Sequence, residues 1–205
     1  MIESTDSDCL IYEYRPLRVY VNLTNRCTNE CAFCARTAAE YRLGSFDLRL
    51  AREHPADDYV AALEQRMASN QRPVEVVFCG FGEPTLRIDT LLEIAHWVKG
   101  KGVSVRLNTN GQAELIHHAD IVSRLVGLID RANISLNAPD SESYVRVARP
   151  VAGHDAWPWV TGFLRRAVRH LPDAWASVVG QSLSAEEVSA AHQLAAFCGT
   201  RLLVR

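Results

Sequence analysis

Several features common in membrane, secreted and nucleic-acid-binding proteins are missing from this sequence. No stretch approaches the roughly 20 consecutive apolar residues of a membrane span. The first eight residues are acidic and polar, the opposite of a secretory signal. The formal net charge is -2, so no overall positive field attracts nucleic acid or an anionic membrane. We therefore expect a cytoplasmic protein whose partners include neither a membrane nor a nucleic acid.

Features that would divide the chain are missing as well. There is no internal repeat, no low-complexity tract and no linker rich in proline and glycine. The 205 residues suit one domain and are enough to bury a hydrophobic core. We predict a short N-terminal extension, residues 1–16, followed by a single core domain, residues 17–205.

Short apolar segments alternate with amphipathic segments along the chain. The apolar ones are typical of buried parallel strands and cover residues 17–23, 74–79, 103–108, 131–136, 175–179 and 201–204. The amphipathic ones predict helices over residues 56–67, 89–98, 113–125, 156–170 and 184–198, the last with the capping-box pattern of Ser184 and Glu187. This alternation predicts an α/β fold with a parallel sheet, as an open doubly wound sheet or a partial barrel. In both, ligands gather at the C-terminal ends of the strands.

Three of the six cysteines are clustered directly after the first predicted strand. Cys27, Cys31 and Cys34 are spaced C-x3-C-x2-C on one loop, so their thiolates can converge on one metal centre. In a reducing compartment, clustered thiols are ligands or nucleophiles rather than disulfide partners. A tetrahedral zinc site requires a fourth ligand, and the nearest histidine in sequence is His54. We favour an iron–sulfur cluster, in which three thiolates leave one iron open to a substrate or cofactor.

A glycine-bearing segment follows the second predicted strand. Gly80, Phe81, Gly82, Glu83 and Pro84 lie close to a dinucleotide-binding pattern. The proline, and the absence of an acidic residue after the third strand, argue against a Rossmann site. Glycines at this point let a ligand approach the backbone, and the glutamate with nearby carbonyls can accept hydrogen bonds from an ammonium group.

The other strand ends carry small polar or charged residues. Asn108, Asn110, Ser135, Asn137 and Ser177 can hydrogen-bond a ligand, although asparagine and serine are also common turn residues. Arg36 and Arg149 are candidate partners of a substrate carboxylate, because a guanidinium binds that group through two parallel hydrogen bonds. Cys79 precedes the glycines, and its role is open between a buried small hydrophobe and a neighbour of the cluster.

Together these motifs resemble the radical S-adenosylmethionine (SAM) superfamily. The CxxxCxxC loop after the first strand is its hallmark, and Phe33 before the third cysteine matches the pattern. Residues 81–84 resemble its GGEP segment, with phenylalanine in place of the first glycine, and residues 108–111 resemble its TNG segment. The resemblance implies a (βα)6 partial TIM barrel, a [4Fe–4S] cluster on the three cysteines, and SAM as the second cofactor.

The resemblance also implies a reaction and its participants. The reduced cluster, chelated by the amino and carboxylate groups of SAM, cleaves SAM to methionine and a 5′-deoxyadenosyl radical that abstracts a hydrogen atom from the substrate. An electron donor of the flavodoxin or ferredoxin type is expected. The residues implied in SAM binding are Phe33, Gly80, Phe81, Gly82, Glu83, Pro84, Asn108, Asn110, Ser135, Asn137 and Ser177.

The sequence narrows the resemblance but leaves alternatives open. The phrases NLTNRCTNECAFCAR and SLNAPDSESYVRVARP resemble small TatD-associated radical SAM proteins, which makes a TatD-family hydrolase a candidate partner protein. A compact enzyme similar to deazapurine synthases or to glycyl-radical activases is an alternative. A third alternative, from another class, is a cluster-binding module for electron transfer or regulation that has no turnover.

Overall fold

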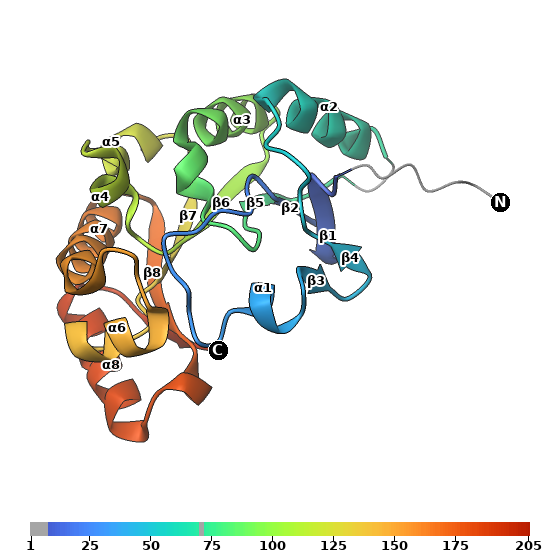
Figure 1. Ribbon diagram of the computed structural model, residues 1–205. Helices are drawn as coiled ribbons and strands as arrows, with labels where there is room; N and C mark the ends of the chain where they lie inside the picture. Colours follow the sequence, from blue (N-terminus) through green and yellow to red (C-terminus); the bar gives the residue numbers. More distant parts are fainter. Residues whose placement is uncertain (1–7, 70–71) are drawn as a thin grey trace.

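The computed structural model describes residues 8–69 and 72–205, so residues 1–7 of the predicted extension lie outside the described part. A seven-stranded sheet forms its centre, in the order β1-β2-β5-β6-β7-β8-β9 (Figure 1). The strands are β1 (Ile11–Arg15), β2 (Arg18–Val21), β5 (Glu75–Phe78), β6 (Ser104–Thr109), β7 (Arg131–Ser135), β8 (Asp173–Val178) and β9 (Leu202–Val204).

The six predicted strands are the six parallel strands of this sheet, β2 to β9, and they follow one another in chain order. The predicted α/β fold with a parallel sheet is therefore confirmed, and the curved sheet is that of a partial barrel. β1 was not predicted; it pairs antiparallel with β2 at one edge. A small hairpin of β3 (Arg42–Leu43) and β4 (Phe46–Asp47) was also not predicted.

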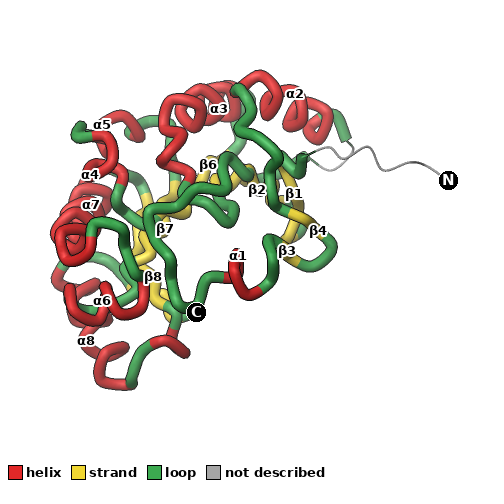
Figure 2. The backbone as a smooth tube through the Cα atoms, viewed as in Figure 1, coloured by secondary structure: helices red, strands yellow, loops and turns green. Residues whose placement is uncertain are grey.

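Helices cover the outer side of the curved sheet, whereas α1 (Ala35–Ala38) lies on the inner side (Figures 1 and 2). The outer helices include α2 (Ala56–Met67), α3 (Ile88–Gly100), α6 (Ser141–Ala148), α7 (Ala156–His170) and α8 (Ala185–Phe197). The predicted capping box at the start of α8 is confirmed, because Ser184 and Glu187 hydrogen-bond each other's backbone amides. α6 was not predicted, since its eight residues are too short for a clear helical period.

The single helix predicted over residues 113–125 is wrong. Two short helices, α4 (Ala113–His117) and α5 (Ile121–Leu125), replace it because His118 adopts a left-handed conformation with φ 49°. Asp120 then starts α5, its carboxylate accepting a hydrogen bond from the Ser123 amide at 3.1 Å. Nε2 of His117, in the last turn of α4, lies 2.7 Å from the carbonyl oxygen of Thr85.

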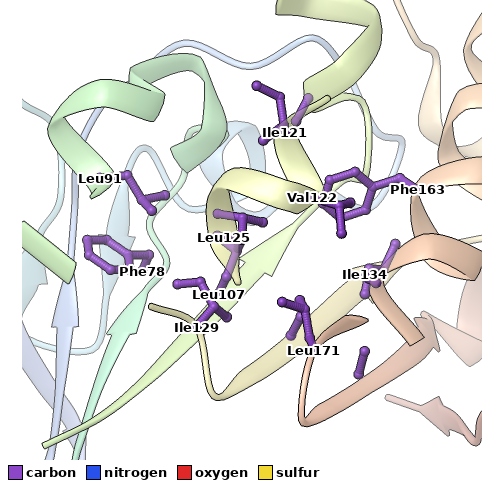
Figure 3. Packing of buried hydrophobic residues seen from close by; sticks show 14 of the residues in the cluster. Phe78, Leu91, Leu107, Ile121, Val122, Leu125, Ile129, Ile134, Phe163 and Leu171 are labelled. Atoms are coloured by element: carbon purple, nitrogen blue, oxygen red, sulfur yellow. The ribbon is translucent and has the colours of Figure 1, made fainter. Parts of the chain in front are cut away.

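The hydrophobic core lies between the sheet and the outer helices. Phe78, Leu107 and Ile134 project from β5, β6 and β7 toward these helices, where they meet residues such as Leu91 and Phe163 (Figure 3). All five side chains are fully buried, and burial of each stabilises the fold by about 1.5–3 kcal/mol. The opposite face of the same strands is free to carry polar side chains.

The inner face of the sheet is closed at one end by an ion cluster. The buried carboxylate of Glu75 is contacted by Arg18 Nε at 3.3 Å, Arg106 Nη2 at 3.4 Å and Arg131 Nη1 at 3.3 Å. Arg106 is thus an ion-pair partner of Glu75. These residues lie at or near the N-terminal ends of their strands, so the ion cluster occupies that end of the sheet.

Candidate active site

A cavity of about 300 Å³ lies at the C-terminal ends of the strands. Its walls come from the loop after β2, the loop after β5, and the ends of β6, β7 and β8. The lining residues with polar or thiol side chains are Cys27, Asn29, Cys31, Cys34, Cys79, Glu83, Asn108, Thr109, Asn110, Asn133, Ser135, Asn137 and Arg205. Residues more than 170 positions apart therefore meet in one site.

The three clustered thiols all line this cavity. Burial, with a smaller effect of the Glu83 carboxylate, raises the pKa of Cys27 to about 11. Burial and the neighbouring thiols of Cys27 and Cys34 raise the pKa of Cys31 to about 12. The bare site therefore favours neutral thiols, and a bound metal group must displace their protons.

The donor set fits a cluster. In the described residues, no group of three or more His, Cys, Asp or Glu side chains is placed to hold a single metal ion. Around one zinc ion, thiolates would lie within about 4 Å of one another, because each Zn–S bond is about 2.3 Å. Three thiolates that line one cavity match the ligand chemistry of an iron–sulfur cluster, which Cys27, Cys31 and Cys34 would hold.

The cysteine loop, residues 25–34, is held against the end of α6 by backbone hydrogen bonds. The amide of Glu30 donates to the carbonyl of Arg149 at 3.1 Å, and the amide of Ala32 donates to Val147 at 2.9 Å. Arg149 has a left-handed conformation with φ 46°, which ends α6 at this point. The loop is thus fixed along its length rather than only at its two ends.

A group of buried side chains fixes the middle of the same loop. Gln112 Nε2 donates to Asn29 Oδ1 at 2.6 Å and to the hydroxyl of Tyr144 at 2.9 Å. Asn29 Nδ2 also donates to that hydroxyl at 3.2 Å. All three residues are buried, and Asn29 lies midway between the first two cysteines. This group, Asn29, Gln112 and Tyr144, is called the amide–tyrosine cluster below.

Two N–H groups point at the first cysteine. The amide of Asn29 lies 3.5 Å from the sulfur of Cys27, and Nδ2 of Asn110 lies 4.0 Å from it. Asn110 Nδ2 also donates to the hydroxyl of Thr28 at 2.8 Å. Hydrogen bonds to a ligating sulfur tune the reduction potential of an iron–sulfur cluster.

The glycine loop, residues 79–83, packs directly on the backbone of the preceding loop. A Cβ atom on Gly82 would lie 2.1 Å from the carbonyl oxygen of Thr24 and 2.6 Å from that of Arg26. A Cβ on Gly80 would lie 2.3 Å from Oδ1 of Asn22. The glycines were predicted to let a ligand approach; in the structure they let the two loops approach each other.

Glu83 connects the glycine loop to the end of β6. Its carboxylate accepts hydrogen bonds from the amide and hydroxyl of Thr85 at 3.1 and 2.6 Å, from the hydroxyl of Thr109 at 2.7 Å, and from the amide of Asn110 at 2.7 Å. Burial raises the pKa of this carboxyl, while the four donors favour its ionised form. Oε1 accepts three of these hydrogen bonds and Oε2 only one, so Oε2 keeps an open acceptor position.

Comparison with known protein families identifies the family to which this chain belongs. The family model of the Radical SAM superfamily matches residues 21–194, most of the chain. The chain belongs to the radical SAM superfamily. A search among curated proteins found none that matches the sequence. Among the described residues, none of the helices is long and apolar enough to cross a membrane.

Solved radical SAM structures share the fold. SuiB from Streptococcus suis, bound to its precursor peptide SuiA, matches with a TM-score of 0.68 and 19% identity, over 90% of this chain and 38% of SuiB. SuiB bound to SAM gives 0.67 and 19%, over 92% and 38%. TYW1 with a lysine–pyruvate adduct gives 0.60 and 14%, over 92% and 64%. This chain spans about two fifths of the length of SuiB.

The cavity contains most, but not all, of the residues predicted for the cofactor site. Those lining the cavity are Cys27, Cys31, Phe33, Cys34, Gly80, Phe81, Gly82, Glu83, Asn108, Asn110, Ser135 and Asn137. Ser177 is fully buried and paired in register with Ser135 but does not line the cavity, and Pro84 begins a short 3-10 turn. Arg36 donates to the carbonyl of Asn25 at 3.0 Å. Neither Arg36 nor Arg149 lines the cavity, and their substrate-binding roles stay predictions.

Several residues that line the cavity or support the cysteine loop were missed. Asn133 lies inside β7, where only the two-residue alternation with Ala132 and Ile134 could have marked it as facing inward. Arg205 follows the last strand, at a strand end like the other predicted residues. Gln112 and Tyr144 carry no motif, and only the folded contacts connect them to the cysteine loop.

Proposed function

We propose that this protein is an enzyme that reductively cleaves SAM at a [4Fe–4S] cluster and uses the resulting radical to abstract a hydrogen atom from a substrate. One observation supports the proposal above all: the three thiols of the CxxxCxxC loop line the same cavity as the glycine loop and the strand-end amides. A module that only carried electrons would have no use for a second binding surface facing its cluster.

Each group of residues has a part in this reaction. When bound, the cluster supplies the electron that breaks a carbon–sulfur bond of SAM, giving methionine and the 5′-deoxyadenosyl radical. Cys27, Cys31 and Cys34 hold the cluster, and the N–H groups of Asn29 and Asn110 near Cys27 stabilise its thiolate. Backbone groups of the glycine loop and the amides of the later strands hold SAM and exclude water.

Glu83 acts in this proposal through the loops that it connects. Its Oε1 accepts from Thr85 and Thr109, whereas its Oε2 accepts only from the amide of Asn110, so Oε2 and carbonyl groups of the glycine loop can accept from the ammonium of SAM. The carboxylate also fixes the distance between the glycine loop and the end of β6. It therefore positions the two loops and keeps one acceptor position for SAM.

The narrower assignments follow from the sequence resemblance. We propose a member of the TatD-associated group, acting as an oxidoreductase or lyase in the cytoplasm, with a flavodoxin or ferredoxin as electron donor. A TatD-family hydrolase or another protein is the proposed partner. SuiB was solved with a precursor peptide, so a partner protein or peptide is one substrate class and a small molecule is the other.

The test is 5′-deoxyadenosine formation by the anaerobically reconstituted protein, given SAM and dithionite. We expect product, and expect Cys27→Ala, Cys31→Ala and Cys34→Ala each to lose both the cluster and the product. Cys198→Ala is the matched control, since this buried cysteine belongs to the hydrophobic core and should leave both intact. A cluster that is reduced but forms no product, and does not bind SAM, would identify a non-catalytic cluster protein.

A further inference from the structure

A fourth thiol lines the cavity and has no part in the reaction described so far. Cys79 lies directly after β5, at the start of the glycine loop. Phe78 packs into the outer core, so the alternation of side chains along a strand places Cys79 on the opposite, inner face of the sheet. Leu107 pairs in register with Phe78, which places Asn108 beside Cys79. The thiol therefore projects from the inner face of the sheet into the cavity.

The space that this thiol faces is suited to hold a ligand. Oδ1 of Asn133 and Oδ1 of Asn137 accept no hydrogen bond from the described residues, although the two residues are only 5% and 2% exposed. An unsatisfied buried polar group costs about 1–3 kcal/mol, so a bound molecule is expected to complete them. In the proposed function that molecule is SAM. Cys79 then lines the space in which the 5′-deoxyadenosyl radical forms.

Cys79 differs from the other three thiols of the cavity because it keeps its proton. Cys27, Cys31 and Cys34 lose theirs when they bind a cluster. Burial raises the pKa of the Cys79 thiol, and the neighbouring Asn108 side chain lowers it by less. Within the described part of the chain, Cys79 is thus the one cavity thiol that still has an S–H bond beside a bound cluster.

An S–H bond in this position matters because the proposed chemistry produces carbon radicals. A carbon radical takes a hydrogen atom from a thiol far more readily than from a hydroxyl, an amide or a guanidinium, since the S–H bond is weaker than O–H and N–H bonds. Those three groups supply the other exchangeable hydrogens of the cavity lining, and no tyrosine or tryptophan of the described residues lines it. Cys79 is therefore the side chain best suited to give a hydrogen atom to a radical there.

We propose that Cys79 is a catalytic hydrogen-atom donor, which passes the hydrogen of its thiol to the carbon radical that remains after the substrate has reacted. The S–H bond breaks and a C–H bond forms, which leaves a closed-shell product and a thiyl radical on Cys79. One electron from the reductant that also reduces the cluster, and one proton from water, restore the thiol. The inference rests on the proposed function. It supports the lyase among the proposed reaction types, because the last radical gains a hydrogen atom instead of losing an electron.

The test follows a solvent isotope and needs no substrate, because the 5′-deoxyadenosyl radical is itself a carbon radical in the same cavity. The reconstituted protein is equilibrated in D₂O, which converts S–H to S–D while carbon-bound hydrogens do not exchange. It is then given SAM and dithionite in a buffer without added thiols. We expect mass spectrometry to show deuterium in the 5′-deoxyadenosine that forms.

The deuterium should be lost in Cys79→Ser, because a hydroxyl hydrogen is too strongly bound to be abstracted. It should be retained in the matched control Cys9→Ser. Cys9 packs against the same small group of buried residues as Cys79, but it does not line the cavity. The proposal is overturned if the wild-type product contains no deuterium, or if Cys79→Ser retains it.

Iron content and SAM affinity separate this role from its competitors. Cys79→Ser should keep the full iron content and bind SAM as tightly as the wild type, since the thiol is neither a cluster ligand nor a ligand of SAM in this proposal. Loss of iron in the variant would make Cys79 a ligand of the cluster and overturn the proposal. Weaker SAM binding with unchanged deuterium incorporation would overturn it as well, and would assign the thiol to SAM binding.

Failure of the proposed function has a different signature. In that case the reconstituted wild-type protein forms no 5′-deoxyadenosine at all, and the hydrogen-donor role fails with the reaction on which it rests. 5′-Deoxyadenosine that forms without deuterium refutes the role of Cys79 alone and leaves the cleavage of SAM established.

Discussion

Gly82 is a point of close approach between the glycine loop and the cysteine loop, and replacing it with alanine should disturb both. The added Cβ would lie 2.1 Å from the carbonyl oxygen of Thr24 and 2.6 Å from that of Arg26. Both atoms belong to the backbone, so no side-chain rotation relieves the contact, and the loops must separate until the nearest distance reaches at least 3.0 Å. Such overpacking costs about 1–3 kcal/mol.

This shift has two measurable consequences. At about 2–4 °C per kcal/mol for a chain of this size, the unfolding temperature of Gly82→Ala should fall by about 2–12 °C. A displacement approaching 1 Å between the loops that hold the cluster and SAM can lower the rate of 5′-deoxyadenosine formation by about 100-fold. Thermal unfolding followed by circular dichroism under anaerobic conditions, and the rate at saturating SAM, measure the two effects.

The matched control is Gly162→Ala in the middle of α7. A Cβ there meets nothing within 4 Å, and alanine is the better helix former by about 1 kcal/mol, so this variant should be slightly more stable than wild type and fully active. If Gly82→Ala matches wild type in unfolding temperature and in rate, the close approach of the two loops is not a feature of the folded protein.

The remaining predictions concern other contacts around the site and the fold. Tyr144→Phe removes the hydroxyl that accepts hydrogen bonds from Asn29 and Gln112, and should lower the free energy of unfolding by about 1–3 kcal/mol. The variant should also lose its iron–sulfur cluster faster after a chelator is added; an unchanged rate of loss would show that the amide–tyrosine cluster does not support iron binding. Glu83→Gln should lower stability by a similar amount and weaken SAM binding, with iron content intact by colorimetric assay; equal stability would refute its four hydrogen bonds. The hydrogen bond from Arg201 lowers the pKa of the Asp173 carboxyl below its usual 3.8. The ionised carboxylate therefore stabilises the fold fully above about pH 4, and this stabilisation is lost as the pH falls through the lowered pKa. In Asp173→Asn, the unfolding temperature should fall less steeply with acid than in the wild type.

The parallel sheet was predictable because its signal is local. Each of its strands is a short apolar segment between amphipathic ones, and β-branched residues such as Val76 and Val105 mark the face that packs on the helices. β1 escaped prediction because its residues, Ile11–Arg15, mix apolar and charged side chains at an edge. The break between α4 and α5 depends on one left-handed residue, His118, at a position where the sequence has no glycine.

The candidate site was predictable where chemistry is written in motifs, and unpredictable where it depends on folded contacts. The spacing of Cys27, Cys31 and Cys34 is visible in the sequence, and the three thiols do line one cavity. The contact of Gln112 with Asn29 joins residues 83 positions apart, and that of Tyr144 with Asn29 joins residues 115 apart. No local pattern encodes pairs of that separation.

The glycine loop shows that the residues of one motif can serve contacts within the protein as well as a ligand. Its glycines and Glu83 were expected to face a ligand, because glycine permits close approach and a carboxylate accepts from an ammonium. The same two properties are used here within the protein, since Gly82 approaches the Thr24 backbone and Glu83 accepts from four protein donors. Mutation of Gly82 or Glu83 would therefore weaken SAM binding whether these residues contact SAM or only hold the loops together. Stability separates them: a direct ligand can be removed at little cost to the unbound fold, whereas Glu83→Gln and Gly82→Ala should lower the unfolding temperature before any SAM is added.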